Sequence, residues 1–203
     1  MANVALIGAS GNAGSRILKE LSDRGHHVTA IARHPEKILK LPHVTAVRGD
    51  TADRSDLAKA LRGHDAVVSS VHFQDFDPTD LLEAVRASGV KRYISVGGAG
   101  SLEVAPGQLL VEQPDFPAAY KAEATRGLTY LQRLREVKDL DWTFISPSAM
   151  FEPGERTGKF RLGGDQLLSN SAGSSISFED YAVALVDELE NPQHVRQRFT
   201  VGY

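Results

Sequence analysis

The feature that most constrains the fold is a glycine-rich turn that follows a short apolar run at the start of the chain. The run Val4–Ile7 is followed directly by Gly8-Ala9-Ser10-Gly11-Asn12-Ala13-Gly14. Ile17, Leu18 and Leu21 then recur at helical spacing. This order predicts a buried strand, a tight turn and a helix with one apolar face.

Each glycine of the turn has a separate role in such a unit. Gly8 allows the tight turn off the strand, Gly11 lets the backbone approach a pyrophosphate, and Gly14 lets the helix pack closely on the sheet. The phosphates would lie on the free N–H groups of the helix N-terminus. A flexible strand-to-helix turn without a ligand is the alternative. The position of the glycine-rich segment directly after an apolar strand favours a dinucleotide site. The expected cofactor residues here are Gly8, Ser10, Gly11, Asn12, Ala13 and Gly14.

Short apolar runs alternate with helical patterns along the chain, at about thirty residues per unit. Strands are predicted at 4–7, 27–32, 44–47, 66–69, 91–96, 141–145 and 199–201. Helices are predicted from the glycine turn to about 24, at 36–39, from Asp53 through Leu61, from Pro78 through Val85, at 118–137 and at 178–189. Parallel strands joined by right-handed crossovers show this alternation. We therefore expect an α/β protein with a doubly wound Rossmann fold, a mostly parallel sheet and one domain over residues 1–203.

Composition narrows the function classes. With 203 residues, 41% of them hydrophobic, the chain can form one sizeable core. A net charge of −3, with the charges interspersed, argues against nucleic acid or a membrane as partner. The chain has no cysteine, and its seven histidines lack ligand spacing, so neither thiol chemistry nor a metal site is expected. No apolar segment is long enough to span a membrane, and we expect a cytoplasmic monomer or homodimer.

Residues at the carboxyl ends of the predicted strands are the next candidates, because doubly wound sheets bind ligands outside those ends. Arg33 ends the second strand, where an NAD site usually has an acidic residue. A guanidinium suits a 2′-phosphate, which favours NADP(H) over NAD(H) as cofactor. A solvated arginine at a strand end is the alternative.

Three other strand ends complete the expected cofactor site. Asp50, after the third strand, either accepts a hydrogen bond from the adenine amino group or serves as a turn residue. Small residues after the fourth and fifth strands let a ribose or the nicotinamide approach the backbone, although a plain turn has the same composition. These residues are Ser69, Ser70, Val71, Val96, Gly97 and Gly98.

Together, several segments resemble the atypical short-chain dehydrogenase/reductases, in particular the NAD(P)H-binding group that contains flavin reductase and biliverdin-IXβ reductase. The segments are residues 8–14, 49–50, 90–93, 96–102, 141–143 and 146–147, which cover nearly the whole chain. The first is common to a broad superfamily, whereas 96–102 and 142–147 are more specific to bacterial members named as NADH-flavin reductases. The resemblance implies a Rossmann fold, a nicotinamide dinucleotide and a pocket beside the nicotinamide formed by residues about 147–203.

The chain departs from the larger family at the usual catalytic pair. Typical members have Tyr-x-x-x-Lys, in which the lysine lowers the pKa of the tyrosine so that the phenol exchanges a proton with the substrate. Here Lys121 follows Tyr120 directly, and Ala124 stands four residues after Tyr120. Adjacent helical residues point about 100° apart, so Lys121 cannot take the usual role. Tyr120 is the candidate catalytic residue if it enters the pocket, and a surface tyrosine is the alternative.

These observations favour an NAD(P)H-dependent reductase that transfers hydride to a small planar acceptor such as a flavin or a quinone. Such acceptors can take their proton from water, so positioning would supply most of the catalysis. The expected walls of the acceptor pocket, with ordinary core as the alternative, are Ser148, Met150, Phe151 and Pro153. A non-catalytic, dinucleotide-binding redox regulator also remains open. A sugar or small-molecule epimerase is disfavoured, because the proton-transfer pair is absent and the C-terminal third is short.

Overall fold

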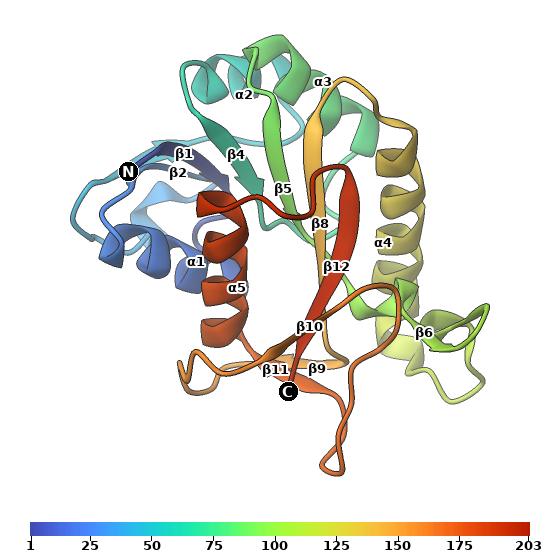
Figure 1. Cartoon of the computed structure of the whole chain (residues 1–203). Helices are drawn as coiled ribbons and strands as arrows, with labels where there is room; N and C mark the ends of the chain where they lie inside the picture. The colour runs from blue at the N-terminus through green and yellow to red at the C-terminus, as the bar shows by residue number, and fades with distance from the viewer.

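The computed structural model describes residues 1–203, and Figure 1 shows the arrangement of its elements. The strands are β1 (Asn3–Ile7), β2 (His27–Ala32), β3 (Val44–Arg48), β4 (Ala66–Ser69), β5 (Arg92–Val96), β6 (Glu103–Ala105), β7 (Gln108–Leu109), β8 (Asp141–Pro147), β9 (Met150–Glu152), β10 (Arg161–Gly163), β11 (Ser175–Ser177) and β12 (Gln197–Gly202). The α-helices are α1 (Asn12–Asp23), α2 (Arg54–Leu61), α3 (Pro78–Ser88), α4 (Ala118–Glu136) and α5 (Phe178–Glu190). Three 3₁₀ helices are η1 (Pro35–Lys37), η2 (Ala99–Ser101) and η3 (Leu110–Glu112).

Local side chains fix where several helices begin. Asp53 accepts a hydrogen bond from the backbone N–H of Asp56 at 3.0 Å and so caps α2. Asp77 caps α3, whose first residue is Pro78. Ser177 caps α5 in the same way. The helix starts predicted at Asp53 and Pro78 are therefore confirmed.

Eight strands form the central sheet, in the order β10-β12-β8-β5-β4-β1-β2-β3. Every neighbouring pair is parallel except β10 and β12. The chain starts with β1 in the middle, moves outward to β3, and then returns to β4 and moves outward the other way. This confirms the doubly wound fold, and it places the reversal of strand order between β1 and β4, where such sheets bind ligands.

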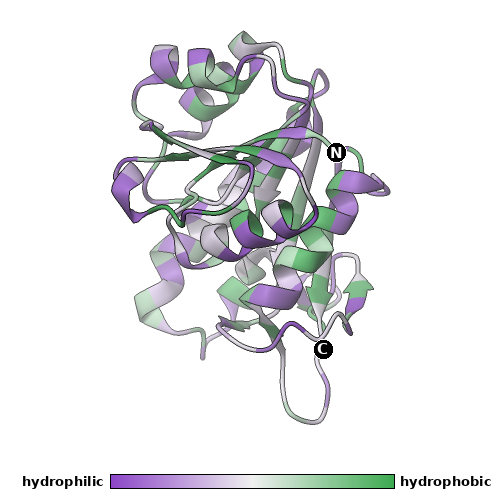
Figure 2. Cartoon of the chain, turned by 90° about the vertical axis from the view of Figure 1, so that its left-hand side faces the viewer, coloured by the Kyte–Doolittle hydropathy of each residue, from purple (hydrophilic) through white to green (hydrophobic).

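The core lies on both faces of this sheet, because alternate strand side chains point to opposite sides. On one face α1 and α5 cover a cluster that includes Leu6, Val68 and Leu185. On the other face α2, α3 and α4 cover a cluster that includes Ile7 and Val67. Figure 2 shows the hydrophobic residues concentrated in the sheet. No helix has both the length and the apolar content needed to cross a bilayer.

The differences from the sequence prediction lie in short elements. The helix predicted at 36–39 is the three-residue η1, and the unpatterned stretch 97–117 contains η2, β6, β7 and η3. The irregular region beyond Pro147 contains β9, β10 and β11, each of three residues. Elements of two or three residues are too short to show a periodicity, and the partner of β9 is the distant β11.

The segment between β9 and β10, residues 153–160, is here called the strap. In Figure 1 the region that contains β9 and β11 lies at the end of the sheet where the C-terminus lies. The Asp180 carboxylate, which is fully buried, accepts hydrogen bonds from Thr157 Oγ1 at 2.6 Å and the Gly158 N–H at 2.7 Å. Arg156 of the strap donates to Glu20 of α1 at 2.8 Å. Charged side chains therefore hold the strap against α1 and α5.

Candidate cofactor site

A cleft of about 140 Å³ opens at the carboxyl ends of β1, β2, β3 and β4, which is the point where the strand order reverses. Few of its lining residues are hydrophobic, and most belong to the connections that follow the four strands. They are Ile7, Gly8, Ser10, Gly11, Ile31, Ala32, Arg33, Gly49, Asp50, Thr51, Ser70, Val71, His72 and Asp75. Of the predicted cofactor residues, the cleft thus brings together Gly8, Ser10, Gly11, Arg33, Asp50, Ser70 and Val71.

Steric crowding explains two of the glycines in the turn. Gly8 has φ +82°, a left-handed conformation, and a Cβ at this position would overlap the carbonyl oxygen of Ser70. A Cβ on Gly14 would overlap the carbonyl oxygen of Gly8. The close packing of α1 on the turn therefore requires glycine at both positions.

The N-terminus of α1 is suited to hold a phosphate. Its N-cap residue, Gly11, has no side chain to accept a hydrogen bond, and the first turn contains no acidic residue. The N–H groups of Asn12, Ala13 and Gly14 therefore have no capping side chain, and the positive end of the helix dipole faces the cleft. These features fit the pyrophosphate of a dinucleotide.

Arg33 and Asp75 face each other across one end of the cleft. Arg33 Nη2 lies 3.5 Å from Asp75 Oδ2, and their side chains are 63% and 41% exposed. Asp50 lines the same end, but its Oδ1 accepts the N–H of Ala52 at 3.0 Å, as a turn residue would. The structure therefore combines an exposed guanidinium and an exposed carboxylate at the end of β2.

Several predicted cofactor residues have packing contacts instead of a place in the cleft wall. Ser69 is buried beside Tyr93. A Cβ on Gly97 would come within 2.5 Å of the Phe144 ring and 2.6 Å of the Ile145 carbonyl oxygen, so this glycine permits the close approach of β5 to β8. Val96 and Gly98 are half-buried beside it. Their predicted contact with the nicotinamide remains a prediction.

Tyr120 lies in the first turn of α4, with 67% of its surface exposed. It shares a helix face with Glu123, Ala124 and Gly127. That face packs on the loop after β4 and on η2: Glu123 accepts the N–H of Phe73 at 2.7 Å, and a Cβ on Gly100 would crowd Ala124. Tyr120 therefore stands one turn beyond the contact between α4 and the loop that borders the cleft.

Lys121 points away from Tyr120. Its Nζ donates to the carbonyl oxygen of Val111 and lies 5.7 Å from the centre of the Phe116 ring. Lys121 is therefore engaged with η3 and the loop before α4, and does not take the usual catalytic role. Tyr93 and Tyr130 are no substitutes, because both are fully buried, their hydroxyls lie 2.7 Å apart, and burial raises the pKa of each.

The predicted acceptor residues lie in different environments. Ser148 is fully buried and donates to the Val201 carbonyl oxygen at 3.1 Å. The Phe151 ring packs against Phe178 and Tyr181, at centroid distances of 4.5 and 4.7 Å. Met150 is 54% exposed, and Pro153 is exposed at the start of the strap. Met150 and Pro153 are exposed, whereas Phe151 is half-buried and Ser148 is buried. The pocket role of all four remains a prediction.

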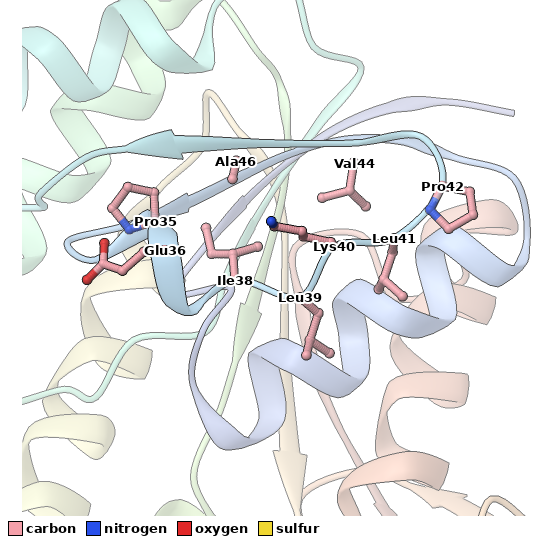
Figure 3. A pocket seen from close by; sticks show the side chains of 9 residues that line it. All are labelled: Pro35, Glu36, Ile38, Leu39, Lys40, Leu41, Pro42, Val44 and Ala46. Carbon is pink, nitrogen blue, oxygen red and sulfur yellow. The ribbon is translucent and has the colours of Figure 1, made fainter.

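A second, larger cavity of about 400 Å³ lies between β3 and the segment after η1 (Figure 3). Its nine lining residues are Pro35, Glu36, Ile38, Leu39, Lys40, Leu41, Pro42, Val44 and Ala46. Its lining contains no residue of the glycine turn and no α-helix N-terminus, and no cluster of polar groups converges on it. The smaller cleft, which has both features, is the candidate cofactor site.

Comparison with known proteins agrees with this geometry. Residues 8–192 match the model of the NAD(P)H-binding family, so the chain belongs to that family. The chain is 38% identical to the uncharacterized protein YwnB of Bacillus subtilis, over 98% of this chain and 97% of that one.

Two solved structures have the same fold over nearly their full length. A Bacteroides thetaiotaomicron protein described as a "putative epimerase" is 39% identical, with a TM-score of 0.94 over 99% of this chain and 96% of that one. A Streptococcus pneumoniae protein described as a "putative NADH-flavin reductase" is 33% identical, with a TM-score of 0.85 over 100% and 99%. The resemblance to the atypical short-chain dehydrogenase/reductases is confirmed.

The cleft also contains residues that the sequence analysis did not list as cofactor contacts, and Asp75 is the acidic one among them. It lies in the loop between β4 and α3, which has no motif and no periodicity. One signal was available, because every loop after a parallel strand reaches the same edge of the sheet as the glycine turn. His72, in the same loop, lines the cleft and lies with its Nδ1 3.4 Å from Glu123 Oε1.

Proposed function

We propose that the protein is an NADPH-dependent reductase whose acceptor is a small planar molecule such as a free flavin or a quinone. The observation that carries the proposal is the polar cleft at the strand reversal, with an uncapped helix N-terminus on one side and Arg33 at the end of β2. The neighbour named as an NADH-flavin reductase adds support for this acceptor class.

When bound, the dinucleotide would supply the hydride. The N–H groups of the first turn of α1 would hold its pyrophosphate, and Arg33 would hold the 2′-phosphate with charge-assisted hydrogen bonds. Tyr120, at the start of α4, is the proposed contact with the acceptor. Residues 147–203 would form the rest of the proposed pocket, with Met150 exposed in β9 and Pro153 exposed at the start of the strap.

The test is oxidation of NADPH and NADH, followed at 340 nm against free flavins, quinones and simple ketones, with cofactor binding measured in parallel. Oxidation of NADPH that depends on a flavin or a quinone is the expected result. Tight binding without oxidation of any acceptor would contradict the reductase and support a redox regulator, which the lack of a lysine beside Tyr120 also fits. Proton exchange at a sugar carbon with retained cofactor would support an epimerase, as the Bacteroides neighbour is named.

Arg33 gives the proposal a residue-level test. Replacing it with Ala removes the proposed partner of the 2′-phosphate, so NADPH binding should weaken by about 1–3 kcal/mol, the range for hydrogen bonds to charged groups. NADH binding should change little, since NADH has no phosphate there. Calorimetric titration of both cofactors measures the difference, and equal losses would contradict phosphate recognition.

A further inference from the structure

The loop between β4 and α3, residues 70–77, holds Asp75 at the cleft. Phe73 and Phe76, on either side of Asp75, are 7% and 8% exposed and belong to the core under α3 and α4. A Cβ on Gly127 would come within 2.7 Å of the Phe73 ring, so this anchor fits tightly against α4. Asp75 therefore lies between two buried side chains in a loop with little freedom to move away.

Hydrogen bonds hold the same loop from both sides. Glu123 of α4 accepts the N–H groups of Phe73 and Gln74 at 2.7 and 3.0 Å. Thr51, which follows β3 and is buried, donates to the Asp75 carbonyl oxygen at 3.2 Å. The backbone of Asp75 is thus held independently of its carboxylate, which is left to face Arg33.

The position of this carboxylate is chemically distinctive. In a Rossmann fold the adenosine ribose lies at the end of β2, and an acidic residue there accepts a hydrogen bond from the 2′-hydroxyl of NAD. This chain has Arg33 at that place, but Asp75 brings a carboxylate to within 3.5 Å of it from a different loop. The cleft therefore holds one group suited to a 2′-phosphate and one suited to a 2′-hydroxyl.

We infer that Asp75 is a specificity-determining residue that opposes Arg33, so that the site accepts NADH as well as NADPH. With NADH, the carboxylate accepts the 2′-hydroxyl. With NADPH, Arg33 leaves Asp75 for the phosphate, at little cost because exposed ion pairs are weak. Asp75 then remains as a negative charge near the phosphate and limits the preference for NADPH. This inference rests on the proposed cofactor site.

The test is Asp75→Asn, which keeps the shape of the side chain and removes its charge. Calorimetric titration should show NADPH binding about 3–10 times more tightly, because a like charge is gone, and NADH binding about 3–10 times more weakly, because an amide is a poorer acceptor. The gain for NADPH should shrink in 0.5 M salt, which screens exposed charges. The free energy of unfolding should stay close to that of the unsubstituted protein, since the backbone contacts of Asp75 remain.

Asp23→Asn is the matched control. Asp23 is also an exposed, ion-paired aspartate, 2.5 Å from Lys19, but it lies in the last turn of α1, at the far end of the helix from the glycine turn. It should change neither affinity by more than about twofold. If Asp75→Asn moves both affinities in the same direction or leaves both unchanged, the inference is wrong.

The outcome also separates this inference from the proposed function. If Arg33→Ala weakens NADPH alone while Asp75→Asn changes nothing, the role of Asp75 fails and the NADPH site stands. If the unsubstituted protein binds neither dinucleotide, both fail together.

Discussion

The glycine turn beside the cleft is shaped by backbone geometry, whereas the strap is held against α1 and α5 by charged side chains. Gly8 and Gly14 are needed because no Cβ fits where β1, α1 and the β4 loop meet. The strap instead depends on the buried carboxylates of Glu20 and Asp180, which are 4% and 0% exposed. The two glycines lie within one seven-residue turn, whereas the contacts of the strap join residues more than twenty positions apart.

This difference has an energetic consequence. A backbone overlap cannot be relieved without moving a whole element, because interiors are densely packed. A lost ion pair or hydrogen bond can be replaced in part by water, since the strap is exposed over residues 153–159. Substitutions in the glycine turn should therefore cost more than substitutions in the strap network.

Gly14→Ala should have the largest effect. Its Cβ would overlap the Gly8 carbonyl oxygen, so α1 must shift from the turn, and we expect a loss of about 3 kcal/mol in the free energy of unfolding, at the upper end for overpacking. Urea denaturation measures the loss. Gly164→Ala is the control, because a Cβ at Gly164 meets nothing within 4 Å and should leave the stability unchanged. Equal stability of the two variants would show that the turn is not sterically constrained.

Asp180→Asn tests the strap and should cost less. The carboxylate accepts from Thr157, Gly158 and the Tyr203 hydroxyl, which lies at 2.8 Å. Asparagine keeps one acceptor oxygen and replaces the other with an NH2 group that cannot accept, so at least one of these hydrogen bonds is lost. We expect a loss of about 2 kcal/mol and faster hydrogen exchange at residues 153–160. Asp187→Asn, on the same helix with a 55% exposed side chain, is the control. If exchange at the strap stays slow in Asp180→Asn, the buried carboxylate is not what holds it.

The same difference explains what could be predicted from the sequence. The glycine turn, the strand ends and Arg33 follow from local patterns, and the doubly wound order follows from strand–helix alternation. The position of Asp75 could not be predicted, because it depends on Phe73 and Phe76 packing into the core from a loop without a sequence pattern. A glycine that lets two strands pack closely cannot be told in sequence from one that lets a cofactor approach the backbone. The contacts of Gly97 with Phe144 could therefore not be foreseen.

Glu20→Gln should have a smaller effect that depends on pH. Hydrogen bonds from Arg156 and Arg24 hold the pKa of Glu20 below its ordinary value of 4.5. A lowered pKa in the folded state means that this stabilisation is complete above pH 4.5 and is lost as the pH falls below it. We expect Glu20→Gln to cost about 1 kcal/mol at pH 7. Urea denaturation should show the gap closing towards pH 3, and a gap that stays constant with pH would contradict the role of the charge.

Tyr120→Phe should have the smallest effect, and it tests a helix that belongs to neither region. The Tyr120 side chain is 67% exposed and has no lysine beside its hydroxyl, since Lys121 donates to Val111. General acid catalysis by a positioned group contributes about 10²–10⁴-fold, but a flavin or quinone acceptor can take its proton from water. We therefore expect kcat to fall less than about tenfold. Steady-state kinetics with NADPH and a flavin measure the change, and a loss above about a hundredfold would show that Tyr120 is the proton donor without its usual lysine. That result would make α4 part of the chemistry of the reaction.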